Sequence, residues 1–314
     1  MTETQADDLA SDVERRSRSR RWQAVVGLLG LAGLAIAVAT TMDDVQGRAL
    51  PGPGALAASL VLSAAALICA GAGWATLFPP EADRRALVSA LYTSQLTKYL
   101  PAGGFVQVAS QVTLAGQTSG MVAAAVRLPV YSMCTVCAGA TLGSLLAVNG
   151  SLPVWSRVLA GLGLLSPVLL DRRLLGWILD QARRVVHRVP SADELPAQRQ
   201  IVRCFAYSLG TLTAYAAAFT CLIGDLADVR PLVAGAALCV AWVVGYLVIP
   251  VPSGIGVREA ILVAALPGLG AGPLLAASLA HRLLTVIAET VLAATSVVRL
   301  KRSRASAHDE VTLS

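Results

Sequence analysis

The feature that most constrains this chain is a series of long stretches that contain no charged residue. Each stretch reaches the roughly 20 residues that an α-helix needs to cross the apolar core of a bilayer. Charged residues make up only 14% of the 314 residues, whereas an average soluble domain has about 25%. The sequence therefore predicts an all-α, polytopic membrane protein. The uncharged stretches are 22–42, 49–80, 128–156, 204–224 and 231–257.

Two other classes of segment do not fit these stretches. A transmembrane barrel requires short segments in which polar and apolar residues alternate, and the chain lacks them. A removed signal peptide is shorter than the first stretch and ends at a cleavage site of small residues. The stretch 22–42 is too long and too poor in such a site. We therefore expect it to be a membrane helix.

Basic residues cluster beside the uncharged stretches, and the formal net charge is +6. The clusters lie in 15–21, 171–199 and 299–304. Because positive residues gather on the cytoplasmic side of membrane proteins, all three are predicted to be cytoplasmic. They flank membrane segments and lack interleaved aromatic residues, so no nucleic-acid partner is expected. Their predicted role is to anchor the topology, in contact with anionic lipid.

The predicted organisation is one membrane domain with two polar tails. Residues 1–20 form a disordered basic cytoplasmic tail, 21–300 the transmembrane domain, and 301–314 a second cytoplasmic tail. Within the domain, 171–199 is a cytoplasmic basic segment with the spacing of an amphipathic helix. The chain is thus expected to be a multi-pass protein of the cell (cytoplasmic) membrane, with both termini inside.

This topology limits how another apolar segment, 86–116, can cross. Residues 82 and 171 should both be cytoplasmic, and two helices expected over 120–148 and 153–170 already satisfy that condition. The segment 86–116 must then leave the membrane on the side from which it entered. Lys98 and a group of prolines and glycines lie near its centre, where the chain would turn.

The same reasoning applies to the second half of the chain. Residues 225–230 should face outward, and a last helix over 272–299 returns the chain to the inside. The segment 231–268 should therefore also return to its starting side, here the outer one. The prediction is about six full crossings plus two re-entrant or broken-helix pairs, which must be enclosed by protein or line a cavity. Continuous helices kinked at proline and glycine are the alternative.

The two broken segments also resemble each other. LPAGGFVQVA at 100–109 and VPSGIGVREA at 251–260 share proline, glycine, valine and alanine at the same offsets. Together with their opposite orientations, this match indicates an inverted repeat. Paired breaks of this kind mark the midplane binding site in transporters. We therefore expect the breaks at Pro101 and Pro252 to lie near the bilayer midplane and close to each other.

Charged residues at membrane depth are expensive and are therefore candidates for function. Three cations and two carboxylates occur at or near the breaks or in the last helix, while glycines allow the backbone to approach a ligand closely. The N-termini of half-helices favour phosphate. The structural alternative is that ion pairs hold the bundle closed. Arg127 is expected to extend to the inner membrane surface. The candidate binding residues are Lys98, Pro101, Gly103, Gly104, Pro252, Gly254, Gly256, Arg258, Glu259, Arg282 and Glu289.

Cofactor and metal chemistry finds no support in the sequence. Cys134 and Cys137 have the spacing of a redox motif, but an apolar helix surrounds them, so they are expected to be packing residues. Histidine, cysteine and acidic residues do not cluster at ligand spacing, and neither a catalytic triad nor a phosphate-binding loop is evident. We expect no cofactor, no metal and no enzymatic activity.

Three motifs carry a family resemblance. They are SQLTKYLPAGG at 94–104, IPVPSGIGVREA at 249–260 and AASLAHRLLTVI at 276–287. Over about 20–300 the chain resembles the lysylphosphatidylglycerol synthase transmembrane-region family, also described as flippase-like. Family members often carry a glutamate in the helix after the first motif. Here that helix has Arg127 and Pro129 and no acid, which puts an acidic partner at this place in doubt.

The resemblance implies a lipid-handling function. In bifunctional relatives this region is similar to the half that moves aminoacylated phosphatidylglycerol between leaflets, while a soluble domain makes the lipid. The sequence beyond residue 300 is expected to be too short for such a domain. The leading prediction is therefore a translocase for an anionic phospholipid or a lipid-linked glycan precursor. The alternative is a non-transporting accessory or scaffold subunit for a lipid-modifying enzyme or glycosyltransferase.

Overall fold

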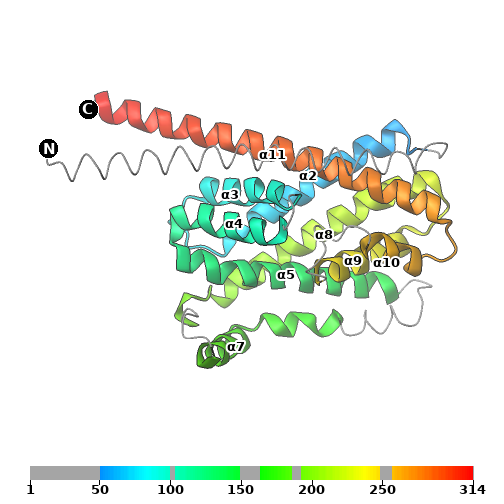
Figure 1. Ribbon diagram of the computed structural model, residues 1–314, viewed down its shortest axis with the longest axis horizontal. Helices are drawn as coiled ribbons and strands as arrows, with labels where there is room; N and C mark the ends of the chain where they lie inside the picture. Colours follow the sequence, from blue (N-terminus) through cyan, green and yellow to red (C-terminus); the bar gives the residue numbers. More distant parts are fainter. Residues whose placement is uncertain (1–49, 100–102, 149–162, 186–191, 248–256, 314) are drawn as a thin grey trace.

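The computed structural model describes residues 50–99, 103–148, 163–185, 192–247 and 257–313. All regular structure within these ranges is helical (Figure 1). The elements in chain order are α2 (Pro53–Thr76), α3 (Arg84–Thr97), α4 (Gly103–Ser119), α5 (Met121–Val148), η1 (Ser166–Leu170), α7 (Arg172–Val185), η2 (Ala192–Glu194), α8 (Gln198–Leu226), α9 (Pro231–Leu247), α10 (Val257–Ala265) and α11 (Ala271–Leu313).

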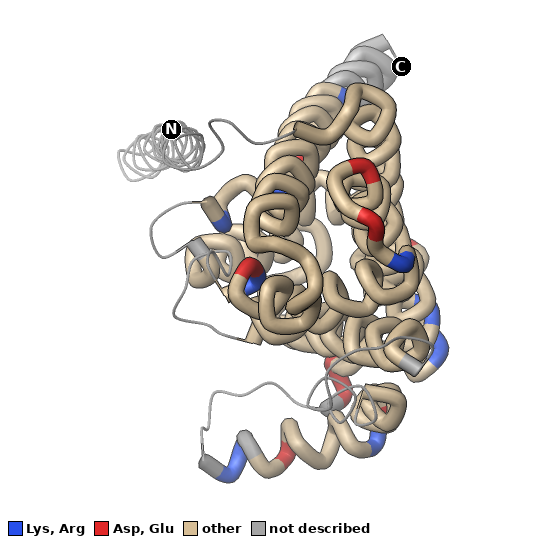
Figure 2. Tube along the Cα trace, turned by 90° about the vertical axis from the view of Figure 1, so that its right-hand side faces the viewer, with Lys and Arg blue, Asp and Glu red and all other residues tan. Residues whose placement is uncertain are grey.

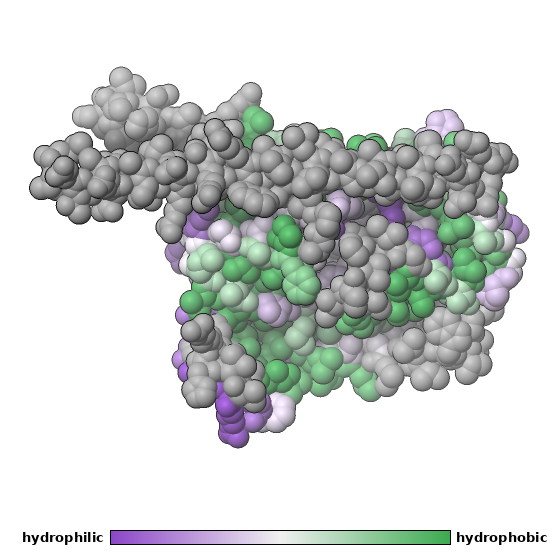
Figure 3. Space-filling model, viewed as in Figure 1, coloured by the Kyte–Doolittle hydropathy of each residue, from purple (hydrophilic) through white to green (hydrophobic). Residues whose placement is uncertain are grey.

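Four of these helices are long and apolar enough to cross a membrane: α2, α5, α8 and the 271–300 part of α11. They run lengthwise through the molecule, and apolar residues cover much of the face in Figure 3. The predicted all-α, polytopic class is therefore confirmed. The predicted helix over 22–42 and most of the one over 153–170 lie outside the described residues, so the number of crossings stays a prediction.

Glycine lets the two most closely packed long helices, α2 and α8, approach each other. A Cβ atom added to Gly73 in α2 would lie 3.0 Å from the Cβ of Tyr207 in α8. Small residues commonly allow such close contact between membrane helices. Trp74, the next residue, is fully buried and meets the rings of Phe78 and Tyr131 edge to face, at 4.8 and 5.5 Å between centroids.

Side-chain caps define the two ends of this bundle. At one end, the backbone N–H of Gly52, just before α2, donates to Asp225 near the end of α8 at 2.5 Å. At the other end, Nε2 of Gln200 in the first turn of α8 donates to the carbonyl of Phe78, just after α2, at 2.9 Å. Helices α2 and α8 are therefore antiparallel. Helix α3 begins at the end marked by Phe78, and α9 begins at the end marked by Asp225.

The two broken segments form helical hairpins that start from these opposite ends. Helix α3 packs beside α4, and α9 beside α10 (Figure 1). Helix α3 has 14 residues and α10 has 9, or about 21 and 14 Å at 1.5 Å per residue. Both are shorter than the roughly 30 Å apolar core of a bilayer. This geometry agrees with the predicted broken-helix pairs rather than with continuous kinked helices.

Arg127 caps the end of α2. Its side chain is buried, and its Nε donates to the carbonyl of Leu77 at 2.9 Å. The guanidinium also lies over the ring of Phe78, 5.2 Å from the centroid. Helix α2 ends at Thr76, so its last carbonyls need donors. These contacts lie at the end of the bundle predicted to be cytoplasmic, and the expectation that Arg127 extends to the inner membrane surface stays a prediction.

Candidate functional site

The middle of α11 brings the two hairpins together. Arg282 and Glu289 lie on either side of the centre of the 271–300 span. They are seven residues, or two helical turns, apart, which is about 10 Å along the axis. Arg282 binds the α9–α10 hairpin, whereas Glu289 binds the α3–α4 hairpin. The described residues beside both breaks thus lie close together, near the centre of the α11 span.

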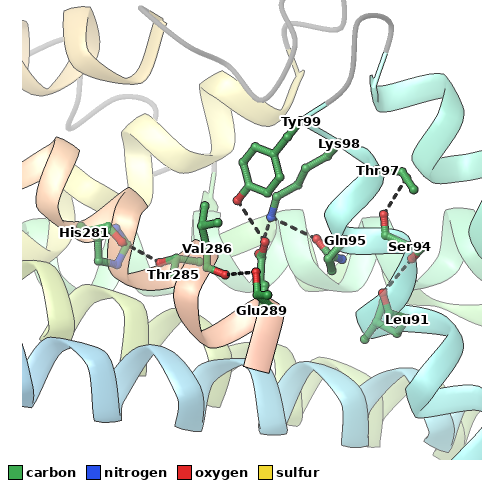
Figure 4. Close-up of polar contacts among 11 residues, drawn as sticks. Leu91, Ser94, Gln95, Thr97, Lys98, Tyr99, His281, Thr285, Val286 and Glu289 are labelled. Atoms are coloured by element: carbon green, nitrogen blue, oxygen red, sulfur yellow. Dashed lines mark hydrogen bonds and ion pairs between the residues drawn. The ribbon is translucent and has the colours of Figure 1, made fainter. Parts of the chain in front are cut away.

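Glu289 receives two donors from the end of α3 (Figure 4). Its Oε1 forms a short ion pair with Nζ of Lys98, and its Oε2 accepts a hydrogen bond from the Tyr99 hydroxyl at 3.0 Å. Nζ of Lys98 also donates to Oε1 of Gln95 at 3.2 Å. The Glu289 side chain is only 1% exposed, against 21% for Lys98. Glu289 is thus a buried carboxylate in α11, and its counter-charge, Lys98, comes from the α3–α4 hairpin.

Glu259, in the first turn of α10, forms the second ion pair. Nη2 of Arg282 lies 3.0 Å from Oε1 and 3.2 Å from Oε2 of this carboxylate. The hydroxyl of Ser278 donates to Oε1 at 2.9 Å. Ser278 lies one turn before Arg282, so both reach Glu259 from one face of α11. About a quarter to a fifth of each charged side chain is exposed, which makes this pair more open than the pair at Glu289.

Arg258 has a different environment from the other two cations. Its guanidinium carbon lies 5.6 Å from the ring centroid of Trp242 in α9, a cation–π contact. Its Nε is buried and has no hydrogen-bond partner among the described residues. The ionisable residues within its electrostatic range include Arg282, Glu259, Tyr99 and Tyr215. Of these, Glu259 forms its ion pair with Arg282. Gly245 makes room for it, because a Cβ atom there would lie 2.6 Å from Cγ of Arg258.

The charges of this cluster do not balance. Among the residues that the structure describes, three cationic side chains (Lys98, Arg258 and Arg282) face two carboxylates (Glu259 and Glu289), which leaves one positive charge. The neighbouring sequence 248–256, VIPVPSGIG, contains no acid that could compensate it. A buried positive charge without a counter-charge is costly. The cluster therefore has the electrostatic character of a site for one anionic group.

The structure brings together the five charged residues predicted for the site. Gly103 begins α4, and Gly104 follows it with open space around it, so Gly104 makes no close approach to another described residue. Pro101, Pro252, Gly254 and Gly256 lie outside the described residues. Glu259 is next to Arg258 in the sequence, but the ion pair that it forms is with Arg282. Neighbours on a helix point in different directions, so residues 258 and 259 serve different partners.

Several contact residues of the cluster were not predicted. Gln95 precedes Lys98 by three residues and Ser278 precedes Arg282 by four, so helical spacing alone could have indicated these two. Tyr99, which directly follows Lys98, could not have been indicated by spacing. Trp242 and Gly245 contact Arg258 only because α9 folds back along α10, and the sequence alone does not give that pairing. His281 lies beside the cluster, edge to face with Tyr215 at 5.6 Å, and its buried Nε2 has no partner among the described residues.

Comparison with protein families decides what kind of bundle this is. The family model described as the lysylphosphatidylglycerol synthase TM region matches residues 22–293. The chain belongs to this family. The match covers both hairpins and α11 as far as residue 293, and therefore all five charged residues of the site. The predicted family is confirmed, and so is the prediction that the chain is a membrane protein; the cell membrane and the orientation of the termini stay predictions. A comparison with curated proteins found no match.

Proposed function

We propose that this member of the lysylphosphatidylglycerol synthase TM-region family binds an anionic lipid headgroup between its two hairpins and moves it across the cell membrane. The observation that carries the proposal is the excess positive charge at Arg258, held at the depth where both hairpins contact α11. The protein acts as a translocase in this proposal and carries out no covalent chemistry. Both termini face the cytoplasm.

A phosphate-bearing headgroup fits this environment best. The guanidinium of Arg258 is planar and can donate two parallel hydrogen bonds to a phosphate. Helix α10 begins at Val257, so backbone N–H groups of its first turn lack helical acceptors and favour a nearby anion. A phosphate monoanion would balance the cluster. Both an anionic phospholipid and a lipid-linked glycan precursor carry such a group.

Lipid binding can be tested by thermal unfolding of the purified protein in detergent. A ligand that binds only the folded state raises the melting temperature, and above its dissociation constant the rise continues with the logarithm of ligand concentration. We expect phosphatidylglycerol to raise the melting temperature in this concentration-dependent way, and phosphatidylcholine at the same concentration to have little effect. Equal stabilisation by the two lipids would contradict a site for anionic headgroups.

One observation favours an accessory function without transport. Lys98–Glu289 and Arg282–Glu259 each join a hairpin to α11, as expected for ion pairs that only hold a bundle together. A scaffold for a lipid-modifying enzyme or glycosyltransferase would need such rigidity but would not need the surplus charge at Arg258. If neutralising Arg258 leaves lipid binding intact, the scaffold becomes the better account.

A further inference from the structure

Helix α7 carries an apolar face that the bundle does not cover. Leu175 is 5% exposed and belongs to the core cluster, so this side of the helix packs on the protein. Trp177 and Ile178, in contrast, are 60% and 42% exposed. A large exposed apolar patch commonly marks an interaction site. Helix α7 thus packs one apolar face on the protein and leaves a second apolar face uncovered by the described residues.

The helix lies crosswise to the membrane-spanning helices. In Figure 1 it is seen nearly along its axis, while α5 and α11 run across the page; in Figure 2 it lies along the lower edge of the molecule. The two views agree that its axis is nearly perpendicular to the long helices. Those helices cross the bilayer, so α7 runs roughly parallel to the membrane plane.

Contacts with α8 fix the level of α7 at one end of the bundle. Oε1 of Gln198, the first residue of α8, accepts a hydrogen bond from the backbone N–H of Arg172 at 2.8 Å. Asp171 caps α7 by accepting from the N–H groups of Arg173 and Leu174 at 2.9 and 3.2 Å. The start of α7 is therefore held where α8 begins. This is the end of the bundle predicted to be cytoplasmic.

The polar side of α7 is strongly basic. It carries four arginines against one aspartate, Asp180. All four arginines are exposed, as is Asp180. In η1, which precedes the helix, Val168 is also an exposed apolar residue, at 65%. The arginines are Arg172, Arg173, Arg183 and Arg184.

We infer that α7 is an interfacial helix that binds the anionic surface of the cytoplasmic leaflet. An amphipathic helix with a tryptophan on its apolar side and arginines beside it lies in the headgroup region of a bilayer. Trp177 and Ile178 enter the boundary between headgroups and acyl chains, and the arginines contact anionic headgroups. The partner of this apolar face is the surface of the surrounding membrane, because α7 is held at the level of that surface and runs parallel to it. This inference needs only the membrane-spanning bundle and not the translocase function.

The test places an environment-sensitive fluorescent amino acid at Ile178 of the full-length protein, reconstituted in vesicles. A second variant carries it at Asp180, about 200° away around the helix at 3.6 residues per turn. In vesicles containing phosphatidylglycerol, we expect the probe at 178 to be quenched by spin-labelled lipid and shielded from aqueous iodide. The probe at 180 should show the reverse.

Charge is tested by replacing Arg173, Arg183 and Arg184 with glutamine, at low salt. Each arginine near an anionic surface should contribute roughly fivefold to the equilibrium between lipid-embedded and water-exposed states. The triple variant should therefore lose lipid quenching at 178 in anionic vesicles. Arg230, which is exposed before α9 at the opposite end of the bundle, provides the control, and Arg230→Gln should change nothing.

Three outcomes would overturn the inference. Iodide access at 178 equal to that at 180 would mean that α7 lies in water. Shielding of 178 from both quenchers would mean that protein, such as a second copy or a partner enzyme, covers this face. Unchanged lipid quenching in purely phosphatidylcholine vesicles or in the triple variant would mean that anionic lipid is not recognised.

Discussion

Arg258 differs from the other cations of the cluster because no carboxylate forms an ion pair with it among the described residues. Lys98 and Arg282 pair with Glu289 and Glu259, whereas Arg258 lies against the ring of Trp242 with an unpartnered Nε. Removing a residue of this kind strands no partner carboxylate. At the residue scale, Arg258 is therefore the cation available to a ligand, whereas Lys98 and Arg282 are engaged in ion pairs that join the hairpins to α11.

The first prediction concerns Arg258→Ala and Arg258→Lys. A hydrogen bond to a charged group contributes about 1.5–3 kcal/mol, so we expect Arg258→Ala to weaken anionic-lipid binding by roughly tenfold to a hundredfold. Arg258→Lys should recover only part of it, because lysine lacks the planar fork. Titration of the melting temperature with phosphatidylglycerol provides the measurement. Full recovery by lysine would mean that charge alone, and not bidentate geometry, is recognised.

The second prediction concerns Lys98, whose partner is almost fully buried. Lys98→Met leaves the Glu289 carboxylate without its counter-charge, and breaking a buried pair costs about 3–5 kcal/mol. We expect a marked loss of thermal stability and of expression. The double variant Lys98→Met with Glu289→Leu should restore much of both. If the single variant melts normally, the ion pair is not structural, and Lys98 joins Arg258 as a ligand group.

At the scale of elements, Gly245 allows α9 and α10 to place Arg258. A Cβ atom at this position would lie 2.6 Å from Cγ of Arg258, which is not the flexible end of that side chain. The third prediction is that Gly245→Ala displaces Arg258 and weakens lipid binding about as much as Arg258→Ala does. Gly224→Ala in α8 is the control, because a Cβ atom there meets nothing within 4 Å. Wild-type lipid affinity in Gly245→Ala would show that the position of Arg258 is not decisive.

The elements themselves were largely predictable from the sequence. The long helices follow from uncharged stretches, and helix boundaries such as 121–148 fall close to the predicted 120–148. The hairpins followed from the count of crossings, because charge fixes the sidedness of the segments around them. Which side chains meet between elements was less predictable: Arg127 as a cap for α2, and Trp242 beneath Arg258, depend on packing that periodicity does not encode. The predicted roles of Pro101 and Pro252 stay predictions.

At the scale of the whole molecule, the account requires a definite sidedness. The fourth prediction is that single cysteines at Arg183 or Arg203 react with a membrane-impermeant reagent only after the cells are opened. A cysteine at Asp228, which is exposed between α8 and α9, should react in intact cells. Labelling at 183 from outside intact cells would show that the orientation is the reverse of the predicted one. The sides from which the two hairpins are predicted to enter the membrane would then be wrong as well.

The central claim is that the cluster at the middle of α11 moves an anionic lipid headgroup across the membrane. The most direct measurement is translocation of fluorescent lipids between leaflets in vesicles containing the purified protein. The account predicts faster exchange of phosphatidylglycerol than of phosphatidylcholine, with the difference lost in an Arg258→Ala variant that melts at the wild-type temperature. Exchange no faster than in protein-free vesicles, or equal for both lipids and unaffected by the substitution, would contradict it.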